Sequence, residues 1–291
     1  MKVAAHSEDI DGISSAALFL IKFPEAEIRF LSVYEAQQTE EEFDYSVDLP
    51  KTKNTKINID HHKSNYERLI NEKKLSKSDM IDPNAPSAAS LVIKYLGLED
   101  NQIAKEIVEM ANQADTGNLN EKLLKLDRVI KYYVTDQEKL RKIAEALARY
   151  GKNFEKDEWL AKQIEEVEKV VREYDEKIKA RVKELVSRGI KYAIFDATKV
   201  PFFVAKEAAH IFSKKGGHIG VSVYIDPVSK KLRCSIRMSK KCNISAHKLA
   251  EKMGGGGHSK AAGAIIGDLS KLISALQDFI PPNELLVYVK I

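Results

Sequence analysis

An aspartate followed by two adjacent histidines is the stretch of this sequence in which chemistry is most clearly expected. Asp60, His61 and His62 follow alternating apolar residues in the segment INIDHHKSN, residues 57–65. Consecutive side chains of a strand point to opposite faces of a sheet, so both histidines can face one site only where the strand has ended. We therefore predict that these three residues lie at the rim of a sheet and form part of a functional site.

Three further segments supply a histidine and several carboxylates in similar positions. They are HSEDIDG with His6, Asp9 and Asp11, SVDLP with Asp48, and ADTGN with Asp115. Imidazole and carboxylate ligands without a thiolate favour Mn²⁺ or a similar divalent ion over a structural zinc. A single aspartate of this kind is more typical of a helix cap or a loop, but several carboxylates at strand ends would repel one another without a cation. Together, the four segments predict a metal centre.

The elements around these segments predict an α/β fold. Strand patterns in residues 2–6, 27–33, 44–48 and 55–60 alternate with helix patterns in residues 11–23, 87–97 and 101–114. This alternation is typical of a parallel sheet, in which functional residues collect at the carboxyl ends of the strands. His6, Asp48 and Asp60 each end such a strand pattern, so we expect them to meet at one edge.

A long helical stretch separates this region from a second α/β region. From Leu160 to Leu185, apolar residues recur every three or four positions, and Gly189 could end the helix. We interpret the stretch as an amphipathic connector, with a dimerising coiled coil, and hence a homodimer, as the alternative. The predicted organisation is a parallel-sheet metal-binding domain in residues 1–120, a helical connector in residues 121–189 and a smaller α/β substrate-binding domain in residues 190–291. We expect the active site to lie between the two α/β domains.

Composition indicates a cytoplasmic protein. The 291 residues are 44% hydrophobic and 31% charged. No apolar run approaches the roughly 18 residues needed to span a membrane, and the amino-terminal segment turns acidic at once, so neither a membrane span nor a signal peptide is predicted. Cys234 and Cys242 lack the spacing of a metal site and are interpreted as free thiols of a reducing compartment.

Charge is divided unevenly along the chain. Residues 1–118 contain 13 Lys and Arg against 21 Asp and Glu, a net charge of −8, whereas residues 191–291 contain 16 against 7, a net charge of +9. An acidic region suits metal ions and a basic region suits phosphate groups, although ordinary surface variation could also produce such a division.

The segments described above resemble the motifs of the DHH phosphoesterases, a family that includes RecJ exonucleases, NrnA-type oligoribonucleases and family II pyrophosphatases. The four histidine and aspartate segments match four motifs of that family in the same order. The segment GGGGHSKAAG, residues 254–263, resembles the GGGH signature of the DHH-associated substrate-binding domain. One spacing differs, because two residues separate His6 from Asp9 whereas the family usually has three. The resemblance covers most of the chain outside the helical connector.

The resemblance implies a two-metal centre. One ion would be held by His6, Asp9 and Asp48, and the other by Asp11, Asp48, His61 and Asp115, so that Asp48 would bridge the pair. The two ions would be Mn²⁺, with Co²⁺ or Mg²⁺ as alternatives. His62 would face the scissile phosphate as a hydrogen-bond donor or proton relay, and Asp60 would orient a histidine ring through a hydrogen bond.

In the carboxyl-terminal domain the resemblance implies a substrate-binding site. The backbone of Gly254, Gly255, Gly256 and Gly257 carries no side chains, so it could close on a phosphate group and donate hydrogen bonds to it. His258 follows directly, and Arg237 ends a strand pattern near two lysines. We expect these six residues to hold the part of the substrate beyond the scissile phosphate.

The expected activity is hydrolysis of short oligonucleotides to mononucleotides, with 3′-phosphoadenosine 5′-phosphate as a further substrate. Alternatives are a cyclic dinucleotide phosphodiesterase, a RecJ-like exonuclease acting on single strands, and a catalytically degraded accessory protein that binds nucleic acid. The complete set of six metal ligands favours an enzyme over the last alternative. The preference for RNA or DNA and the polarity of cleavage stay open.

Overall fold

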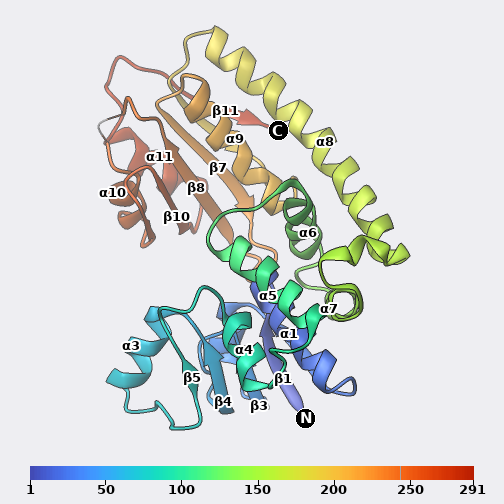
Figure 1. The fold of residues 1–291 in the computed structure, drawn as a ribbon. Coiled ribbons are helices and arrows are strands. Elements are labelled where there is room, and N and C mark those ends of the chain that lie inside the picture. Colours follow the sequence, from blue (N-terminus) through green and yellow to red (C-terminus); the bar gives the residue numbers. More distant parts are fainter. Residues whose placement is uncertain (243) are drawn as a thin grey trace. The chain divides into compact units, whose positions relative to one another are not determined.

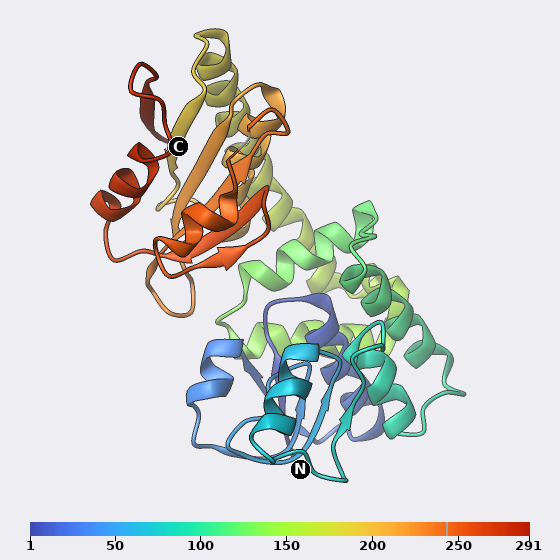
Figure 2. The ribbon, with the colours of Figure 1, turned by 90° about the vertical axis from the view of Figure 1, so that its left-hand side faces the viewer.

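The computed structural model describes residues 1–242 and 244–291, which form two compact units, Met1–Val167 and Glu168–Ile291. Figures 1 and 2 show the ribbon from two directions. The mixed α/β fold class predicted from the sequence is confirmed, with a parallel sheet in the first unit and a mixed sheet in the second. Each unit is described by itself.

The first unit is built on a parallel sheet with the strand order β2-β1-β3-β4-β5. Its strands are β1 (Lys2–His6), β2 (Glu27–Leu31), β3 (Glu42–Val47), β4 (Asn54–Asp60) and β5 (Met80–Ile81). Val3, Ala4 and Ala5 of β1 are fully buried, as expected for a central parallel strand that is covered on both faces. Because β1, β3 and β4 are neighbours and run in the same direction, the residues at their carboxyl ends come together at one edge.

Helices surround this sheet and continue into a helical layer. They are α1 (Ile10–Lys22), α2 (Val33–Gln38), α3 (Lys63–Asn71), α4 (Ala88–Tyr95), α5 (Gln102–Asp115), α6 (Glu121–Tyr132), α7 (Gln137–Tyr150) and the 3₁₀ helix η1 (Gly151–Lys156). Helix α1 contacts α4, α5 and α7, and its side chains are buried from Ile10 to Leu20. A helix that is buried all round fixes the segment that leads into it, and that segment carries part of the predicted metal centre.

The predicted long amphipathic helix is confirmed as α8 (Glu158–Ser187), one helix of 30 residues. It ends at Ser187, two residues before the predicted stop at Gly189, whose φ of 72° lies in the left-handed region that glycine adopts without strain. The amide of Ile190 donates to the carbonyl of Leu185 and that of Gly189 to Val186, which closes the last turn. Among the described residues, none of the helices combines the length and the apolar content that crossing a membrane requires.

The second unit has a mixed sheet with the strand order β11-β6-β7-β8-β10-β9. The strands are β6 (Tyr192–Asp196), β7 (Ile219–Ile225), β8 (Leu232–Met238), β9 (Gly256–Gly257), β10 (Ala261–Ile265) and β11 (Leu286–Lys290). Helices α10 (Ala246–Glu251) and α11 (Leu269–Gln277) share an apolar core with one face of the sheet. Helix α9 (Phe202–Lys215) packs against β7, where a Cβ on Gly220 would lie only 2.9 Å from the carbonyl oxygen of Ala209.

Candidate metal centre

The junction between β1 and α1 brings the first predicted ligands together. Asp9 is the N-cap of α1, where its Oδ1 accepts the Gly12 amide at 3.0 Å, and its Oδ2 lies 2.8 Å from His6 Nδ1. Gly12 allows this close approach, because a Cβ there would lie 2.3 Å from the carbonyl oxygen of His6. The short spacing between His6 and Asp9 therefore leaves the two side chains in direct contact.

Asp48 follows the end of β3 and is almost completely buried, at 2% exposure. Its φ of 54° places it in the left-handed region, which Asp and Asn tolerate better than other non-glycine residues. Its amide donates to the carbonyl of Ile59 on β4, so the turn is tied to the neighbouring strand. Its Oδ2 lies 3.3 Å from His6 Nδ1. The unusual backbone conformation thus places one carboxylate beside the end of β1.

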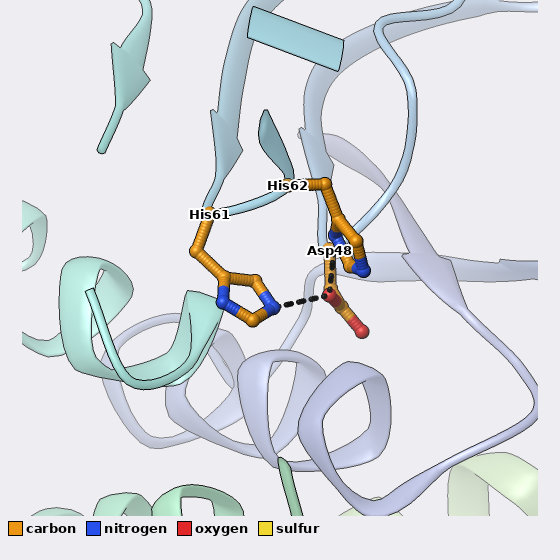
Figure 3. A group of neighbouring side chains, drawn as sticks. All are labelled: Asp48, His61 and His62. Carbon is orange, nitrogen blue, oxygen red and sulfur yellow. Dashed lines mark ion pairs between the residues drawn. The ribbon is translucent and has the colours of Figure 1, made fainter. Parts of the chain in front are cut away.

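The two adjacent histidines lie beyond the end of β4, as predicted, and their ring nitrogens lie close to the same oxygen of Asp48 (Figure 3). His61 Nε2 is 3.7 Å and His62 Nδ1 is 3.6 Å from Asp48 Oδ1. His61 Nδ1 lies 3.3 Å from the carbonyl of Ala85, which accepts a hydrogen bond when that nitrogen carries the proton. This contact leaves the lone pair of His61 Nε2 directed at the carboxylates.

Asp11 and Asp115 approach His61 from two helices. The buried carboxylate of Asp11 accepts the amides of Ala88 and Ala89, at 2.6 and 2.8 Å, at the amino-terminal end of α4. Asp115, the last residue of α5, has its Oδ2 at 2.9 Å from His61 Nε2, and Asp11 Oδ2 is 3.6 Å from the same nitrogen. The positive end of α4 helps to hold Asp11 in a place where water cannot solvate it.

The six predicted ligands therefore converge in space. Their ligand atoms fall into groups close enough to hold an ion: His6 with Asp9 and Asp48, Asp11 with His61 and Asp115, and Asp48 with His61 and His62. Asp48 belongs to two of these groups, in keeping with a bridging position. The third group also contains His62, which the resemblance did not imply as a ligand.

The chemistry of these side chains fits divalent ions. Asp48 Oδ1 and His61 Nε2 are buried and make no hydrogen bond with any described residue. Each of the four carboxylates, those of Asp9, Asp11, Asp48 and Asp115, lies within ion-pair distance of a histidine ring. Buried lone pairs without a donor, next to several carboxylates, are the arrangement that a bound cation would satisfy.

Burial and the closeness of the carboxylates to one another also shift the pKa values of these side chains. Burial, and then the charges of Asp115 and Asp9, raise the pKa of Asp11 to about 7. Burial and the nearby Asp11 raise the pKa of Asp48 well above its ordinary value. Burial would lower the pKa of His61, but its contacts with Asp115 and Asp11 raise it to about 9. Without another cation the cluster holds protons, and a divalent ion would have to displace them.

Asp60 contacts both of the adjacent histidines. It is fully buried, and its Oδ1 accepts the backbone amide of His61 at 2.8 Å and lies 2.9 Å from His62 Nδ1. The hydrogen bond to Asp60 raises the pKa of His62, whose side chain is half exposed. When His62 Nδ1 carries a proton, it can donate that proton to Asp60 in a hydrogen bond, and this contact fixes the orientation of the ring.

Sequence reasoning missed Asn65, which lies behind this contact. Its side chain is buried and its Nδ2 donates to Asp60 Oδ2 at 2.7 Å and to Asn58 Oδ1 at 2.8 Å. Arg68 donates to Asn65 Oδ1 at 3.0 Å, so both ends of the amide are held. Asn65 lies five residues after Asp60 on the first turn of α3, and this spacing is no recognisable sequence signal.

The second unit places the predicted substrate-binding residues around β8, β9 and β10. Arg237 on β8 is paired in register with Ala261 on β10, and its Nη1 donates to Ser235 Oγ and to the carbonyl of Ile236. Gly256 and Gly257 form β9, which pairs with β10, and His258 is exposed in the turn between these two strands.

The glycine run has a structural use that the sequence analysis did not anticipate. The amide of Gly254 donates to the carbonyl of Glu251, and the amide of Gly255 donates to the carbonyl of Ala250. These two hydrogen bonds close the end of α10. A Cβ on Gly255 would lie 2.2 Å from the carbonyl oxygen of Gly263, so the residue is required by packing. These two amides are not free to bind phosphate, whereas a Cβ on Gly256 would meet no described atom within 4 Å.

Comparison with known proteins agrees with this picture. Residues 189–280 match the family model of the DHHA1 domain. The fold resembles that of the pGpG-specific phosphodiesterase PggH from Vibrio cholerae, with a TM-score of 0.59, 17% identity, and coverage of 94% of this chain and 97% of that one. It also resembles that of the manganese-bound exonuclease RecJ, with a TM-score of 0.52, 14% identity, and coverage of 95% and 88%. Comparison with curated protein sequences finds no match.

Residues 189–280 therefore form a DHHA1 domain, and the fold of the chain resembles that of the two phosphodiester-cleaving proteins. These findings agree with the predicted resemblance to the DHH phosphoesterases.

Proposed function

We propose that this protein uses divalent metal ions to hydrolyse short oligonucleotides to mononucleotides, and that it also acts on 3′-phosphoadenosine 5′-phosphate. The observation that carries the proposal is a cluster of two overlapping sets of candidate ligands around the buried Asp48 and its neighbour His61. The cluster consists of His6, Asp9, Asp11, Asp48, His61 and Asp115. An accessory protein that only binds nucleic acid would have no use for buried, mutually repelling carboxylates.

The candidate ligands would bind two metal ions. Asp48 would contact both ions, with His6 and Asp9 on one side and Asp11, His61 and Asp115 on the other. Bound there, two ions, Mn²⁺ in this proposal, would activate a water molecule and neutralise the phosphoryl oxygens during in-line attack.

His62 would act on the substrate rather than on a metal ion. Asp60 accepts its Nδ1 proton, and Asn65 holds Asp60, so the ring is fixed in one orientation. The raised pKa of His62 keeps the ring protonated closer to neutral pH, which suits a donor to a phosphoryl or leaving oxygen.

Two observations support short oligonucleotides as the proposed substrates. The Vibrio cholerae neighbour is specific for pGpG, a linear dinucleotide, and the second unit carries Arg237 and His258 on a DHHA1 domain. We propose that these two side chains, with the backbone of Gly256 and Gly257, bind the part of the substrate beyond the scissile phosphate.

A substrate panel with Mn²⁺ tests the proposal. Purified protein would be incubated with a linear dinucleotide, a cyclic dinucleotide, 3′-phosphoadenosine 5′-phosphate and pyrophosphate, and the products separated by chromatography. We expect mononucleotides from the linear dinucleotide at the highest kcat/KM. Release of phosphate from pyrophosphate alone, or no hydrolysis of any member, would refute the proposed function.

A further inference from the structure

A basic hollow of about 720 Å³ lies in the second unit, between the carboxyl-terminal half of α9 and the segment around the ends of β8 and β10. Its cationic side chains are Lys214, Lys215, Arg237, Lys240, Lys241 and Lys260. None of the described residues that line it is Asp or Glu. The hollow therefore concentrates positive charge on one side of a unit whose net charge is already positive.

Among the described residues, four lysines of this hollow form no ion pair, and Lys260 donates only to a backbone carbonyl, that of Cys242. Within the described ranges, Lys214, Lys215, Lys240 and Lys241 form no ion pair with a carboxylate. By contrast, other cations of the unit form ion pairs, namely Lys191 with Glu284, Arg233 with Asp226 and Lys252 with Asp278. The positive charge of the hollow is thus left for a ligand or for solvent ions.

A second hollow of about 670 Å³ adjoins the first along α9. It is lined by Lys183 of α8 and by Lys179, which forms an ion pair with Asp175. It shares Lys214 and Lys215 with the first hollow. Apolar side chains such as Val186 contribute to its lining. The two hollows form a basic track that is longer than a single phosphate group requires.

Stabilisation of a helix terminus explains only part of this charge. Lys214 and Lys215 lie in the last turn of α9, where cations interact favourably with the helix dipole. Lys240, Lys241 and Lys260 lie outside any helix, and the dipole gives no reason for them. Like charges gathered in one place destabilise a fold unless an anion offsets them, so their common position requires another explanation.

We infer that this basic track binds a run of phosphate groups, namely the backbone of a single-stranded oligonucleotide longer than a dinucleotide. The inference rests on the proposed function for the nature of the strand, and on the lysines of α9 and the segment after β8 for the binding. Lysines contact phosphates without reading bases, and apolar side chains between them can contact sugars and bases. Affinity should therefore increase with strand length and be independent of sequence.

Fluorescence anisotropy with labelled single strands, in excess chelator to prevent hydrolysis, tests the inference. The full-length protein would be titrated against a dinucleotide, a pentanucleotide and a decanucleotide at several salt concentrations. Two variants remove the track, Lys214→Glu/Lys215→Glu on α9 and Lys240→Glu/Lys241→Glu outside any helix. A third, Lys248→Glu/Lys271→Glu, makes the same charge change at exposed positions away from both hollows.

We expect the parent protein and the third variant to bind the longer strands more tightly than the dinucleotide. Both track variants should bind the longer strands about tenfold or more weakly, and the slope of log affinity against log salt should flatten by about 0.7 for each phosphate that is no longer neutralised. Equal weakening in all three variants, or no increase of affinity with length in the parent, would overturn the inference.

Two further measurements complete the test. The first distinguishes an oligonucleotide from inorganic polyphosphate as the ligand, and the second distinguishes failure of the basic track from failure of the proposed function. If inorganic polyphosphate displaced the strand at equal phosphate concentration and itself bound more tightly, the assignment to an oligonucleotide would be wrong. Dinucleotide hydrolysis with Mn²⁺ is measured separately. Hydrolysis without length-dependent binding contradicts only the track, and length-dependent binding without hydrolysis contradicts only the proposed function.

Discussion

Two histidines that are neighbours in the sequence have different partners for their Nδ1 atoms, and this difference assigns them different tasks. His61 Nδ1 lies beside the carbonyl of Ala85, which directs Nε2 toward the carboxylates. His62 Nδ1 lies beside Asp60, and its side chain is half exposed. We therefore propose that His61 binds metal and that His62 contacts the substrate.

Replacement of each histidine by alanine tests this division. His61→Ala should lose bound Mn²⁺, because it removes a ligand from a buried group of carboxylates. His62→Ala should retain the metal but lower kcat by roughly 10²–10⁴-fold, the range for a lost proton-transfer group. Metal content would be measured by elemental analysis and kcat with a dinucleotide. Equal loss of metal in both variants would show that His62 is a ligand as well.

The clustering of the candidate ligands was predictable from the sequence, whereas the residues that support them were not. Histidine and aspartate at strand ends carry a recognisable pattern, and the residues selected by it lie in groups that share Asp48 or His61. Asn65 carries no such pattern, because its importance comes from tertiary contacts with Asp60 and Arg68. The packing role of Gly255 also depends on a tertiary contact, the close approach of two backbone segments. The sequence alone could not predict that contact.

At the scale of elements, the approach of α1 to β1 is what creates half of the metal centre. Helix α1 begins so close to β1 that only glycine fits at position 12. The helix is buried by α4, α5 and α7, so it has little freedom to move away. Any side chain at Gly12 must therefore displace the segment that carries Asp9 and Asp11.

We predict that Gly12→Ala will lower both metal affinity and thermal stability, although alanine is the better helix former. The added Cβ would lie 2.3 Å from the carbonyl oxygen of His6, which forces β1 and α1 apart. Ser15→Ala is the matched control in the same helix, because the buried Ser15 Oγ makes no hydrogen bond with the described residues. Calorimetry with and without Mn²⁺ measures both effects, and wild-type metal affinity in Gly12→Ala would contradict the argument.

The elements that sequence patterns missed are short or polar. Helix α3 buries only Asn65 and Leu69, and β5 has two residues, so neither has an apolar repeat that could be recognised. The remaining strands of the first unit and the long α8 have strong patterns and were predicted close to their observed bounds. Burial against neighbours, rather than local preference, decides the short elements.

At the scale of the whole molecule, the metal centre couples stability to pH. The pKa of Asp11 is raised from 3.8 to about 7, so the folded state binds more protons than the unfolded state across that window, and stability falls as pH rises. The pKa of His61 is raised from 6.5 to about 9, so the stability contributed by its protonated form is present below 6.5 and is lost as pH rises toward 9. Both shifts act in the same direction, whereas the lowered pKa of Asp9 affects stability only below its ordinary value of 3.8, outside this range.

The metal-free protein should therefore lose thermal stability between about pH 5.5 and pH 8, and the increase in Tm on adding Mn²⁺ should grow over the same range. Metal ions displace the protons that Asp11 and His61 hold, which costs less at higher pH. Thermal unfolding with chelator and with excess Mn²⁺ at each pH provides the comparison. A gain in Tm that shrank as the pH rose would contradict the assigned ligands.

The most direct test of the central claim is hydrolysis of a linear dinucleotide by the parent protein and by Asp48→Asn. Asparagine tolerates the φ of 54° at this position, so the variant removes the charge while sparing the backbone. We predict that the parent releases mononucleotides with Mn²⁺ and stops in excess chelator, whereas Asp48→Asn folds but binds less metal and is inactive. Robust hydrolysis in chelator, or near-normal activity and full metal content in Asp48→Asn, would contradict a metal-dependent phosphoesterase centred on Asp48.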